Sequence, residues 1–505
     1  MPWLTILMAV PVVGAVLVAL TPKGNGKLAK QLALGVSVVV LALTIAMAVQ
    51  FSPKGPRFQF VETYDWIPRF GVHYGVGVDG IALVLIALSA VLVPIVVLAS
   101  WYDADAPHAK YSVKTYFALL LVLEAMMIGV FAATDIFLFY VFFEAMLIPM
   151  YFMIGSYGGA QRSYAAVKFL LYSLFGGLLM LVAVIGLYVI AGKNTFLFPE
   201  LIGAIQDPTT QKWLFAGFFF AFAVKAPLWP FHTWLPDAAA QAPAGAAVLL
   251  VGVLDKVGTY GMLRFCLELF PDASKFFTPL VIVLSVVGII YGAIVAIGQT
   301  DMKRLIAYTS ISHFGFIALG VFAMTNDAGA GATLYMVNHG FSTGALFLIA
   351  GFLIARRGSP YIEDYGGVQK VTPKLAGVFL IAGLSGLSLP GLSSFVSEFM
   401  VLIGTYERYM VPAIIAATGV ILAAIYILWM YQRVAAGPTA EPVKEFKDLN
   451  GRELWVVAPL IALIIGLGFY PKPLLDVINP AVDHTLVSVQ VEKFTPAIAE
   501  KGAGQ

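Results

Sequence analysis

The sequence predicts an all-α integral membrane protein that consists of a single membrane domain. Of its 505 residues, 60% are apolar and only 11% are charged, whereas an ordinary soluble domain carries about 25% charged residues. Apolar runs of about 20 residues, the length that crosses a bilayer, recur along the whole chain. The polar connections between these runs are too short to form a further domain, and the longest cover residues 51–78, 102–112, 356–372 and 434–453.

About fourteen apolar runs are long enough to span a membrane. Their approximate bounds are 2–20, 30–51, 79–101, 113–132, 135–156, 165–191, 212–229, 244–269, 277–298, 303–324, 330–355, 373–404 (broken), 411–433 and 454–470. The first run lacks the basic start of a cleaved signal peptide, so we expect it to be retained as the first span.

The distribution of lysine and arginine predicts how the chain is oriented. Of the 30 such residues, 17 lie in or beside odd-numbered loops, 11 lie in or beside even-numbered loops and the termini, and two lie inside spans. Cytoplasmic loops of membrane proteins carry the excess of positive charge. We therefore expect the odd loops in the cytoplasm and both termini on the outer, periplasmic side.

Sequence motifs for redox, nucleotide or metal chemistry are missing. The one cysteine, Cys266, excludes a disulfide within the chain and a Cys-ligated iron–sulfur cluster. No GxGxxG or P-loop motif stands at a strand-to-helix junction, and no HExxH or paired-cysteine spacing occurs. We therefore expect no metal or cofactor in this chain and any redox chemistry in partner proteins.

The stretch Gly217–Gly261 combines charge with helix-breaking residues at membrane depth. Lys225 and Lys256 lie inside apolar runs, and four prolines between them rule out a continuous helix. A charge at the bilayer centre costs roughly 2.5–3.5 kcal/mol on insertion scales, so such lysines are functional candidates.

A second broken span lies about 165 residues after the first one along the chain. Here SGLSLPGLSSFVSEFM is interrupted at Pro390 and Gly391, and Glu398 follows the break. Paired breaks in corresponding halves are typical of inverted-repeat transporters. A broken helix frees backbone groups that only protein or water can satisfy, and water at membrane depth is what a proton path requires.

Five ionisable residues lie near the middle of predicted spans. They are Glu124, Glu144, Lys225, Lys256 and Glu398. A structural ion pair between two helices explains any one of them, but a row of such costly charges favours a transport path. Asp255, next to Lys256, is expected on a different face of its helix, in a packing or hydrogen-bonding contact.

Two neighbouring spans each carry a histidine on one helical face together with two other residues. These sets are Thr309, His313 and Phe316 in one span and Tyr335, His339 and Thr343 in the next. Each set has helical spacing, and histidine titrates near neutral pH and can relay protons. A hydrogen-bonded interhelical histidine is the alternative for either residue alone, but their place between Lys256 and Glu398 favours a relay. His232, between the prolines, is expected in a loop or interface.

An ordered set of motifs, spread over about residues 110–430, resembles a known family. The motifs are FEAMLIPMYFMIGSYGG, KAPLWPFHTWLPDA, DKVGTYGMLR, QTDMKRLIAYTSISHFGFIALG, NHGFSTGALFLIAG and LPGLSSFVSEFM. Together they resemble the antiporter-like membrane subunits of respiratory complex I, which are kin to subunits of Mrp-type cation/proton antiporters.

The resemblance implies fourteen helices, including two inverted five-helix repeats that each contain one broken helix. The chain would then divide into three N-terminal helices (1–112), a first repeat (113–269), a second repeat (277–433), and a final helix with a short polar tail (454–505).

The family's proton-channel residues match six positions of this sequence. They are Glu144, Lys225, Lys256, His313, His339 and Glu398, with Glu124, Tyr335 and Thr309 as accessory candidates. A glutamate at the position of Glu398 is similar to the middle antiporter-like subunit, whereas subunits L and N tend to carry lysine there.

The resemblance implies a proton-translocating subunit of NADH:quinone oxidoreductase that has no redox site of its own. NADH, FMN, iron–sulfur clusters and quinone would bind to partner subunits. Subunits L and N would be neighbours, and the location would be the bacterial cytoplasmic (inner) membrane. The alternatives are a subunit of a Na⁺/H⁺ antiporter, a subunit of a related membrane-bound hydrogenase complex, or a passive spacer.

Overall fold

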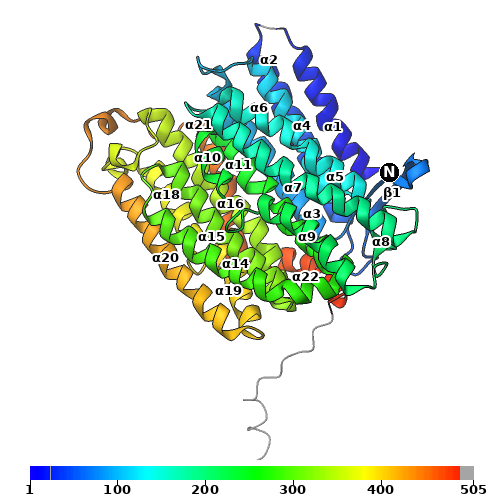
Figure 1. Ribbon diagram of the computed structural model, residues 1–505. Coiled ribbons are helices and arrows are strands. Elements are labelled where there is room, and N and C mark those ends of the chain that lie inside the picture. Colours follow the sequence, from blue (N-terminus) through cyan, green and yellow to red (C-terminus); the bar gives the residue numbers. More distant parts are fainter. Residues whose placement is uncertain (23, 490–505) are drawn as a thin grey trace, which may run out of the picture.

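Helices form most of the chain in the computed structural model, which describes residues 1–22 and 24–489 (Figure 1). Within these residues, twelve helices are long and apolar enough to cross a membrane. The predicted span 212–229 contains the second part of a helix that ends at Lys225, and the next helix begins after a break, at Trp234. The predicted span 373–404 consists of two shorter helices separated by a break. Together these elements account for the predicted fourteen crossings, and the all-α membrane fold is confirmed.

The helices have the following bounds. The N-terminal part contains α1 (Trp3–Leu20), α2 (Gly26–Gln50), α3 (Gly80–Ala99), α4 (Val113–Ala132), α5 (Ile136–Ala145), α6 (Leu147–Tyr157) and α7 (Arg162–Ala191). The middle part contains α8 (Phe198–Leu201), α9 (Pro208–Lys225), α10 (Trp234–Gln241), α11 (Ala244–Leu249), α12 (Lys256–Gly261), α13 (Leu267–Leu269), α14 (Pro271–Ile297) and α15 (Met302–Ala323). The C-terminal part contains α16 (Asn326–Arg357), α17 (Val368–Val371), α18 (Pro373–Gly386), α19 (Ser393–Tyr406), α20 (Met410–Ala435), α21 (Gly451–Phe469) and α22 (Lys472–Val487). Short 3₁₀-helices cover Pro68–Phe70, Ser100–Asp105, Ile362–Asp364 and Glu441–Glu445.

Aspartate residues determine where four of the long helices begin. Asp79, Asp135, Asp207 and Asp301 precede α3, α5, α9 and α15, and each side chain accepts a hydrogen bond from the backbone N–H three residues later. Such a cap satisfies one of the free N–H groups of the first turn. The carboxylate also lies at the positive end of the helix dipole.

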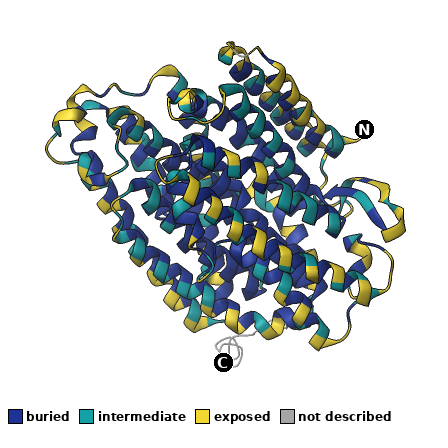
Figure 2. Ribbon diagram, turned by 45° about the horizontal axis from the view of Figure 1, so that its top comes forward, coloured by how far each residue is buried: buried dark blue, intermediate teal, exposed yellow. Residues whose placement is uncertain are grey.

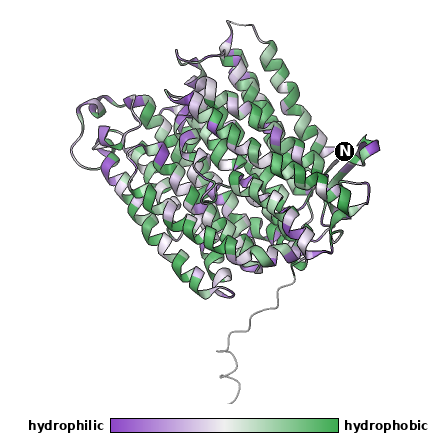
Figure 3. Cartoon of the chain, viewed as in Figure 1, coloured by the Kyte–Doolittle hydropathy of each residue, from purple (hydrophilic) through white to green (hydrophobic). Residues whose placement is uncertain are grey.

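The outer helices expose apolar side chains, whereas the central helices are buried. Val182 in α7 and Ile421 in α20 are 69% and 66% exposed, while α15 and α16 are almost entirely enclosed. Figure 2 shows buried residues concentrated in the middle of the bundle, and Figure 3 shows that outer helices such as α1 and α20 are mostly hydrophobic. An apolar surface of this extent suits lipid and not water.

The predicted span 244–269 is present, but it is not a regular α-helix. Two of its segments, Leu250–Leu254 and Met262–Cys266, are π-helical. The Asp255 N–H donates to the carbonyl of Leu250, five residues earlier, at 3.1 Å. π-Helical turns are rare and occur frequently at functional sites, and this span lies at the centre of the bundle.

The connection 51–78, which the sequence analysis treats only as polar, contains a β-hairpin. Strand β1 (Gln59–Ile67) pairs antiparallel with β2 (Val72–Val78). The chain turns through Gly71, whose φ of +62° suits glycine. The backbone N–H of His73 donates to Asp135 Oδ2 at 2.9 Å, which ties the hairpin to the start of α5.

The predicted tail after the last span contains a helix over residues 472–487. These residues form α22, which buries Ile478, Ala481 and Val482 and packs against α16 and α3. The Thr485 hydroxyl donates to Glu268 Oε1 at 3.0 Å. Apolar residues occupy only one face of this helix. The segment as a whole is therefore polar in composition, which is why no helix was expected from the sequence. The rest of the predicted tail, 490–505, lies outside the described residues.

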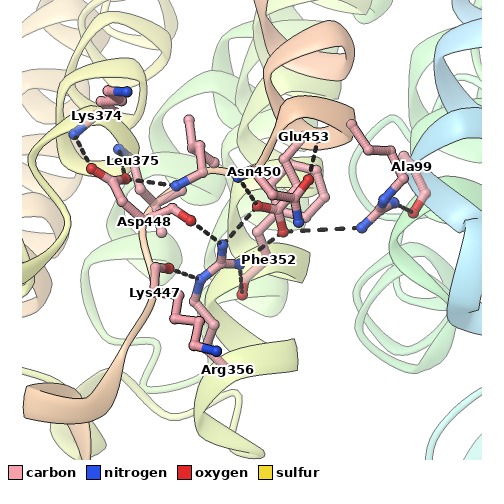
Figure 4. Close-up of polar contacts among 11 residues, drawn as sticks. Ala99, Phe352, Arg356, Lys374, Leu375, Lys447, Asp448, Asn450 and Glu453 are labelled. Atoms are coloured by element: carbon pink, nitrogen blue, oxygen red, sulfur yellow. Dashed lines mark hydrogen bonds and ion pairs between the residues drawn. The ribbon is translucent and has the colours of Figure 1, made fainter.

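A group of polar contacts, here called the Arg356 cluster, joins α16, α18 and α21 on one side of the bundle (Figure 4). It consists of Arg356, Lys447, Asp448, Asn450 and Glu453. Arg356 donates to Glu453 Oε1 and Oε2 at 2.9 and 2.7 Å and to the Lys447 carbonyl at 2.7 Å. Asn450 and Glu453 form a capping box at the start of α21.

Asp448 completes this cluster by binding the first turn of α18. Its carboxylate accepts hydrogen bonds from the backbone N–H groups of Lys374 and Leu375, each at 3.0 Å. Burial tends to raise the pKa of Asp448, but the hydrogen bonds from the backbone N–H groups of Lys374, Leu449 and Leu375 outweigh it and hold this pKa below its ordinary value.

Candidate functional site

The six predicted channel residues lie on six different helical elements in the middle of the bundle. Glu144 is on α5, Lys225 on α9, Lys256 on α12, His313 on α15, His339 on α16 and Glu398 on α19. Glu144 is half-buried, and the other five side chains are buried. We call these six residues the central row.

At one end of the central row, Glu144 approaches Lys225 across closely packed helices. Glu144 lies in the last turn of α5, just before Met146, where α5 ends and α6 begins. Its carboxylate rests against Gly177 of α7, because a Cβ there would lie 1.5 Å from Glu144 Oε1. Lys225 Nζ lies 4.9 Å from the ring centroid of Phe143, the neighbour of Glu144, and interacts electrostatically with Glu144.

Lys225 is the last residue of α9 and lies directly at the predicted break. Pro227 and Pro230 lack the N–H groups that a continuing helix needs, and the chain resumes helical structure only at Trp234. The Trp234 indole N–H donates to the Val224 carbonyl at 2.9 Å, which holds the two half-helices together. A lysine at a helix C-terminus is favoured by the helix dipole.

Lys256 and His339 are in direct contact. Lys256 Nζ lies 2.6 Å from His339 Nδ1 and donates to the Val251 carbonyl, also at 2.6 Å. The π-helical turn explains the contact with Val251. In an α-helix the Asp255 N–H would donate to the Val251 carbonyl, but here it donates to the Leu250 carbonyl, so the Val251 carbonyl can accept from the Lys256 ammonium.

The two histidines continue the row from Lys256. The ring centroids of His339 and His313 are 5.3 Å apart, in an edge-to-face arrangement. His313 Nε2 lies 3.5 Å from the hydroxyl oxygen of Tyr426 on α20, and its ring is 5.7 Å from that of Tyr335.

Glu398 forms the other end of the row and lies just beyond the second break. Tyr335, an accessory candidate, donates its hydroxyl hydrogen to Glu398 Oε2 at 2.8 Å. The Ser388 hydroxyl, in the break between α18 and α19, donates to the same oxygen. The structure therefore links Glu398 to the histidines through tyrosine side chains.

The other two accessory candidates are not joined to the row. The Thr309 hydroxyl donates to the Ile306 carbonyl of its own helix at 2.7 Å. Glu124 is fully buried on α4, and neither carboxyl oxygen has a hydrogen-bond partner among the described residues. His232 lies in the turn between α9 and α10, 5.0 Å from the ring of Tyr291, as expected for an interface residue.

Three further residues belong to this region, although the sequence analysis did not assign them to it. They are Tyr426, Ser388 and Asp255. Tyr426 could have been found because it is a single tyrosine in the apolar run ILAAIYILWM, and Ser388 because it lies in the second break. Within residues 1–22 and 24–489, no group of three His, Cys, Asp or Glu side chains converges as metal ligands would.

Comparison with known proteins identifies a matching family and similar proteins. A family model described as NADH:quinone oxidoreductase/Mrp antiporter, TM, matches residues 133–425. NADH-quinone oxidoreductase subunit M of Mycobacterium tuberculosis (strain ATCC 25618 / H37Rv) is 54% identical over 532 residues, covering 99% of this chain and 96% of the relative. The subunit M of Rhodobacter capsulatus is 41% identical over 520 residues and covers 99% of both chains.

A solved structure supports the same assignment. A chain of respiratory complex I from Thermus thermophilus with bound NADH is similar, with a TM-score of 0.87 and 31% identity over 97% of this chain and 100% of that chain. The resemblance predicted from the ordered motifs is confirmed. The chain belongs to the family of NADH-quinone oxidoreductase subunit M, within the larger family that includes Mrp antiporter subunits.

Proposed function

We propose that this chain is a proton-translocating membrane subunit of an NADH:quinone oxidoreductase and has no redox site of its own. The observation that supports this most strongly is the central row. It brings ionisable side chains from six helical elements together at membrane depth, between two broken helices. Ionisable residues inside a membrane are costly and mark ion or proton paths.

Glu144 controls the charge of Lys225 in this proposal. A nearby carboxylate stabilises the Lys225 ammonium, whose Nζ has no hydrogen-bond partner among the described residues. When Glu144 loses its charge or moves away, the buried ammonium loses the compensation that this carboxylate provides, which is unfavourable. Lys225 then releases its proton toward Lys256.

The remaining residues carry the proton from Lys256 to Glu398. Lys256 Nζ can pass a proton to His339 Nδ1 across their 2.6 Å contact. His313, Tyr426 and Tyr335 extend the path, and Glu398 holds the proton before its release. Histidine suits a relay because both of its ring nitrogens can bind a proton.

The energies are of the required size. Moving one charge against a membrane potential of ~150–200 mV costs about 3.5–4.6 kcal/mol. Two unit charges interact by about 4 kcal/mol at 4 Å and by about 2 kcal/mol at twice that distance, at an effective dielectric constant of 20. The gain or loss of one carboxylate beside a buried lysine is therefore comparable with the work of moving one proton.

The driving energy comes from partner subunits, which hold NADH, FMN, iron–sulfur clusters and quinone. Antiporter-like subunits L and N are the neighbours in this proposal, and the two inverted repeats, 113–269 and 277–433, each supply one broken helix. The location is the bacterial cytoplasmic membrane with both termini outside, which the bacterial relatives and the distribution of basic residues support.

The test uses the assembled native complex with Lys225→Ala or Glu144→Gln in this chain. We expect proton pumping and quinone reduction to fall at least tenfold while assembly on a native gel is unchanged. Lys444→Ala is the matched control, since Lys444 is 55% exposed and pairs with Glu441 at the surface. Full retention of both activities in the two row variants would exclude the proposed roles.

A further inference from the structure

Asp255 is a buried carboxylate that has no assigned role. It is completely buried, directly after the π-helical turn Leu250–Leu254, and neither of its carboxylate oxygens accepts a hydrogen bond among the described residues. A carboxylate in this position is expensive unless a nearby positive charge compensates it.

The packing of α12 shows what Asp255 faces. Gly258 lies one turn after Asp255 on the same helical face, since residues three apart are neighbours. A Cβ at Gly258 would lie 2.5 Å from the Ala226 backbone nitrogen and 2.6 Å from the Phe222 carbonyl oxygen. This face of the helix therefore lies directly against the end of α9, where Lys225 is located.

Asp255 is thus oriented differently from its neighbour Lys256. Lys256 Nζ contacts the Val251 carbonyl and His339, whereas Asp255 lies one turn before Gly258, which packs against α9. Both lysines interact electrostatically with Asp255. Of the two kinds of contact expected from the sequence, a hydrogen bond to the Asp255 carboxylate is absent among the described residues, and packing against α9 occurs one turn away, at Gly258.

We infer that Asp255 is a proton carrier between Lys225 and Lys256. The Lys225 ammonium gives its proton to the Asp255 carboxylate, which leaves a neutral amine and a carboxylic acid. The O–H bond of that acid then breaks, the proton goes to the neutral amine of Lys256, and the carboxylate is restored. One proton has then moved from α9 to α12. The inference rests on the proposed function, because it fills the interval between two residues of the central row.

The Asp255 carboxylate suits this step because it alternates between two partners. While Lys225 is charged, Asp255 is its counter-charge, together with Glu144. After transfer, Asp255 is the acidic group that compensates the Lys256 ammonium. Each resting state therefore keeps one buried carboxylate near one buried ammonium, which reduces the cost of either charge between the two helices.

The experiment replaces Asp255 in the assembled complex and measures proton pumping and quinone reduction. We expect Asp255→Asn, which keeps the shape and removes the proton-binding oxygen, to lower pumping at least tenfold. We expect Asp255→Glu, which keeps the carboxylate, to retain at least a third of the wild-type rate. Asp476→Asn, at an exposed surface pair, is the matched control.

Infrared difference spectra distinguish a carrier from a fixed counter-charge. During turnover the wild type should show the C=O stretch of a carboxylic acid that shifts with isotope-labelled aspartate and is lost in Asp255→Asn. Absence of this band in the wild type would overturn the carrier role. If Asp255→Asn does not assemble, Asp255→Ser takes its place with the same expectation.

The outcomes for Asp255 and for the proposed function are separable. Wild-type pumping in Asp255→Asn, together with loss in Lys225→Ala, would overturn the Asp255 inference and leave the proposed function intact. Wild-type pumping in both variants would overturn the proposed function as well.

Discussion

The central row and the Arg356 cluster both contain buried or half-buried charges, yet their surroundings are opposite. In the Arg356 cluster, the charged side chains of Arg356, Asp448 and Glu453 each have several fixed partners, and Arg356 alone binds two carboxylate oxygens and the carbonyls of Lys447, Asp448 and Phe352. In the central row, hydrogen-bonding atoms without partners recur. Among the described residues these include Lys225 Nζ, Glu144 Oε1, His313 Nδ1 and His339 Nε2.

This difference separates a structural role from a transport role. A fully satisfied polar network stabilises one arrangement, and removing one partner is costly. A buried ionisable group with few fixed partners holds its charged form only weakly, because burial favours the neutral form. It therefore responds to small changes in a neighbouring charge, which is what a proton path requires.

The largest expected effect comes from removing the ammonium of Lys256. In Lys256→Gln, the side chain no longer binds a proton, and the contact with His339 loses its charge. We expect proton pumping by the assembled complex to fall at least a hundredfold, measured by fluorescence quenching of a pH dye in vesicles. Retained pumping would show that Lys256 has a structural role and no role in proton transport.

Arg356→Met reverses the comparison, because it should affect stability and leave transport unchanged. Glu453 would be left buried without its partner, and breaking such a pair costs about 3–5 kcal/mol. We expect less assembled complex and thermal inactivation at a lower temperature, with normal pumping per assembled complex. Arg357→Met is the control, since Arg357 lies 3.9 Å from Asp364 and is more exposed.

Tyr335→Phe tests the far end of the central row. The change removes the hydroxyl that donates to Glu398 Oε2 but keeps the ring. Because a hydrogen bond to a charged group is worth about 1.5–3 kcal/mol, we expect roughly a tenfold loss of pumping. An unchanged rate would show that Ser388 alone holds Glu398.

Gly177→Ala tests the other end by adding one methyl group. The new Cβ would collide with the Glu144 carboxylate and push it from its place near Lys225. We expect a loss of pumping of about threefold, since the carboxylate is displaced and not removed. Gly35→Ala, where a Cβ meets no atom within 4 Å, is the matched control and should pump normally.

The smallest effect is expected for Asp448→Asn and depends on pH. Because hydrogen bonds hold the pKa of Asp448 below its ordinary value, its carboxylate stabilises the fold above the unfolded-state pKa. This stabilisation disappears as the pH falls through the folded-state pKa. We expect the free energy of unfolding of the variant at pH 7 to be about 0.3–0.5 kcal/mol lower than that of the wild type, because solvent screens the interaction. Thermal inactivation of wild type and variant should converge in acid.

The sequence predicted the spans because each depends on local composition. The breaks at Lys225 and before Glu398 were also predictable, since closely spaced prolines, or a proline followed by glycine, remove the backbone N–H groups and the stiffness that a helix needs. The helix α22 was missed because its apolar residues occupy one face, and the β-hairpin because the pairing of Gln59–Ile67 with Val72–Val78 depends on the turn between them.

The membership of the central row was predictable from residue types, but its connections were not. Tyr426 and Ser388 join it only through contacts between distant segments. The orientation of Asp255 depends on how Gly258 packs against α9. Glu124 shows the reverse case, because its place in an apolar span suggested membership and the fold puts it elsewhere.

The π-helical turn before Asp255 makes this span behave as a helix with an inserted residue. A π-turn holds more residues than an α-turn, so deleting one residue from Leu250–Leu254 would leave an ordinary helix and not a gap. The helical segments on either side would keep their orientation, because the wide turn alone takes up the extra residue. Such a chain would still cross the membrane, but the Val251 carbonyl would accept a backbone N–H of the restored α-helix and would no longer be left to the Lys256 ammonium. The extra residue therefore frees one backbone carbonyl for this ammonium, independently of the length and hydrophobicity of the span.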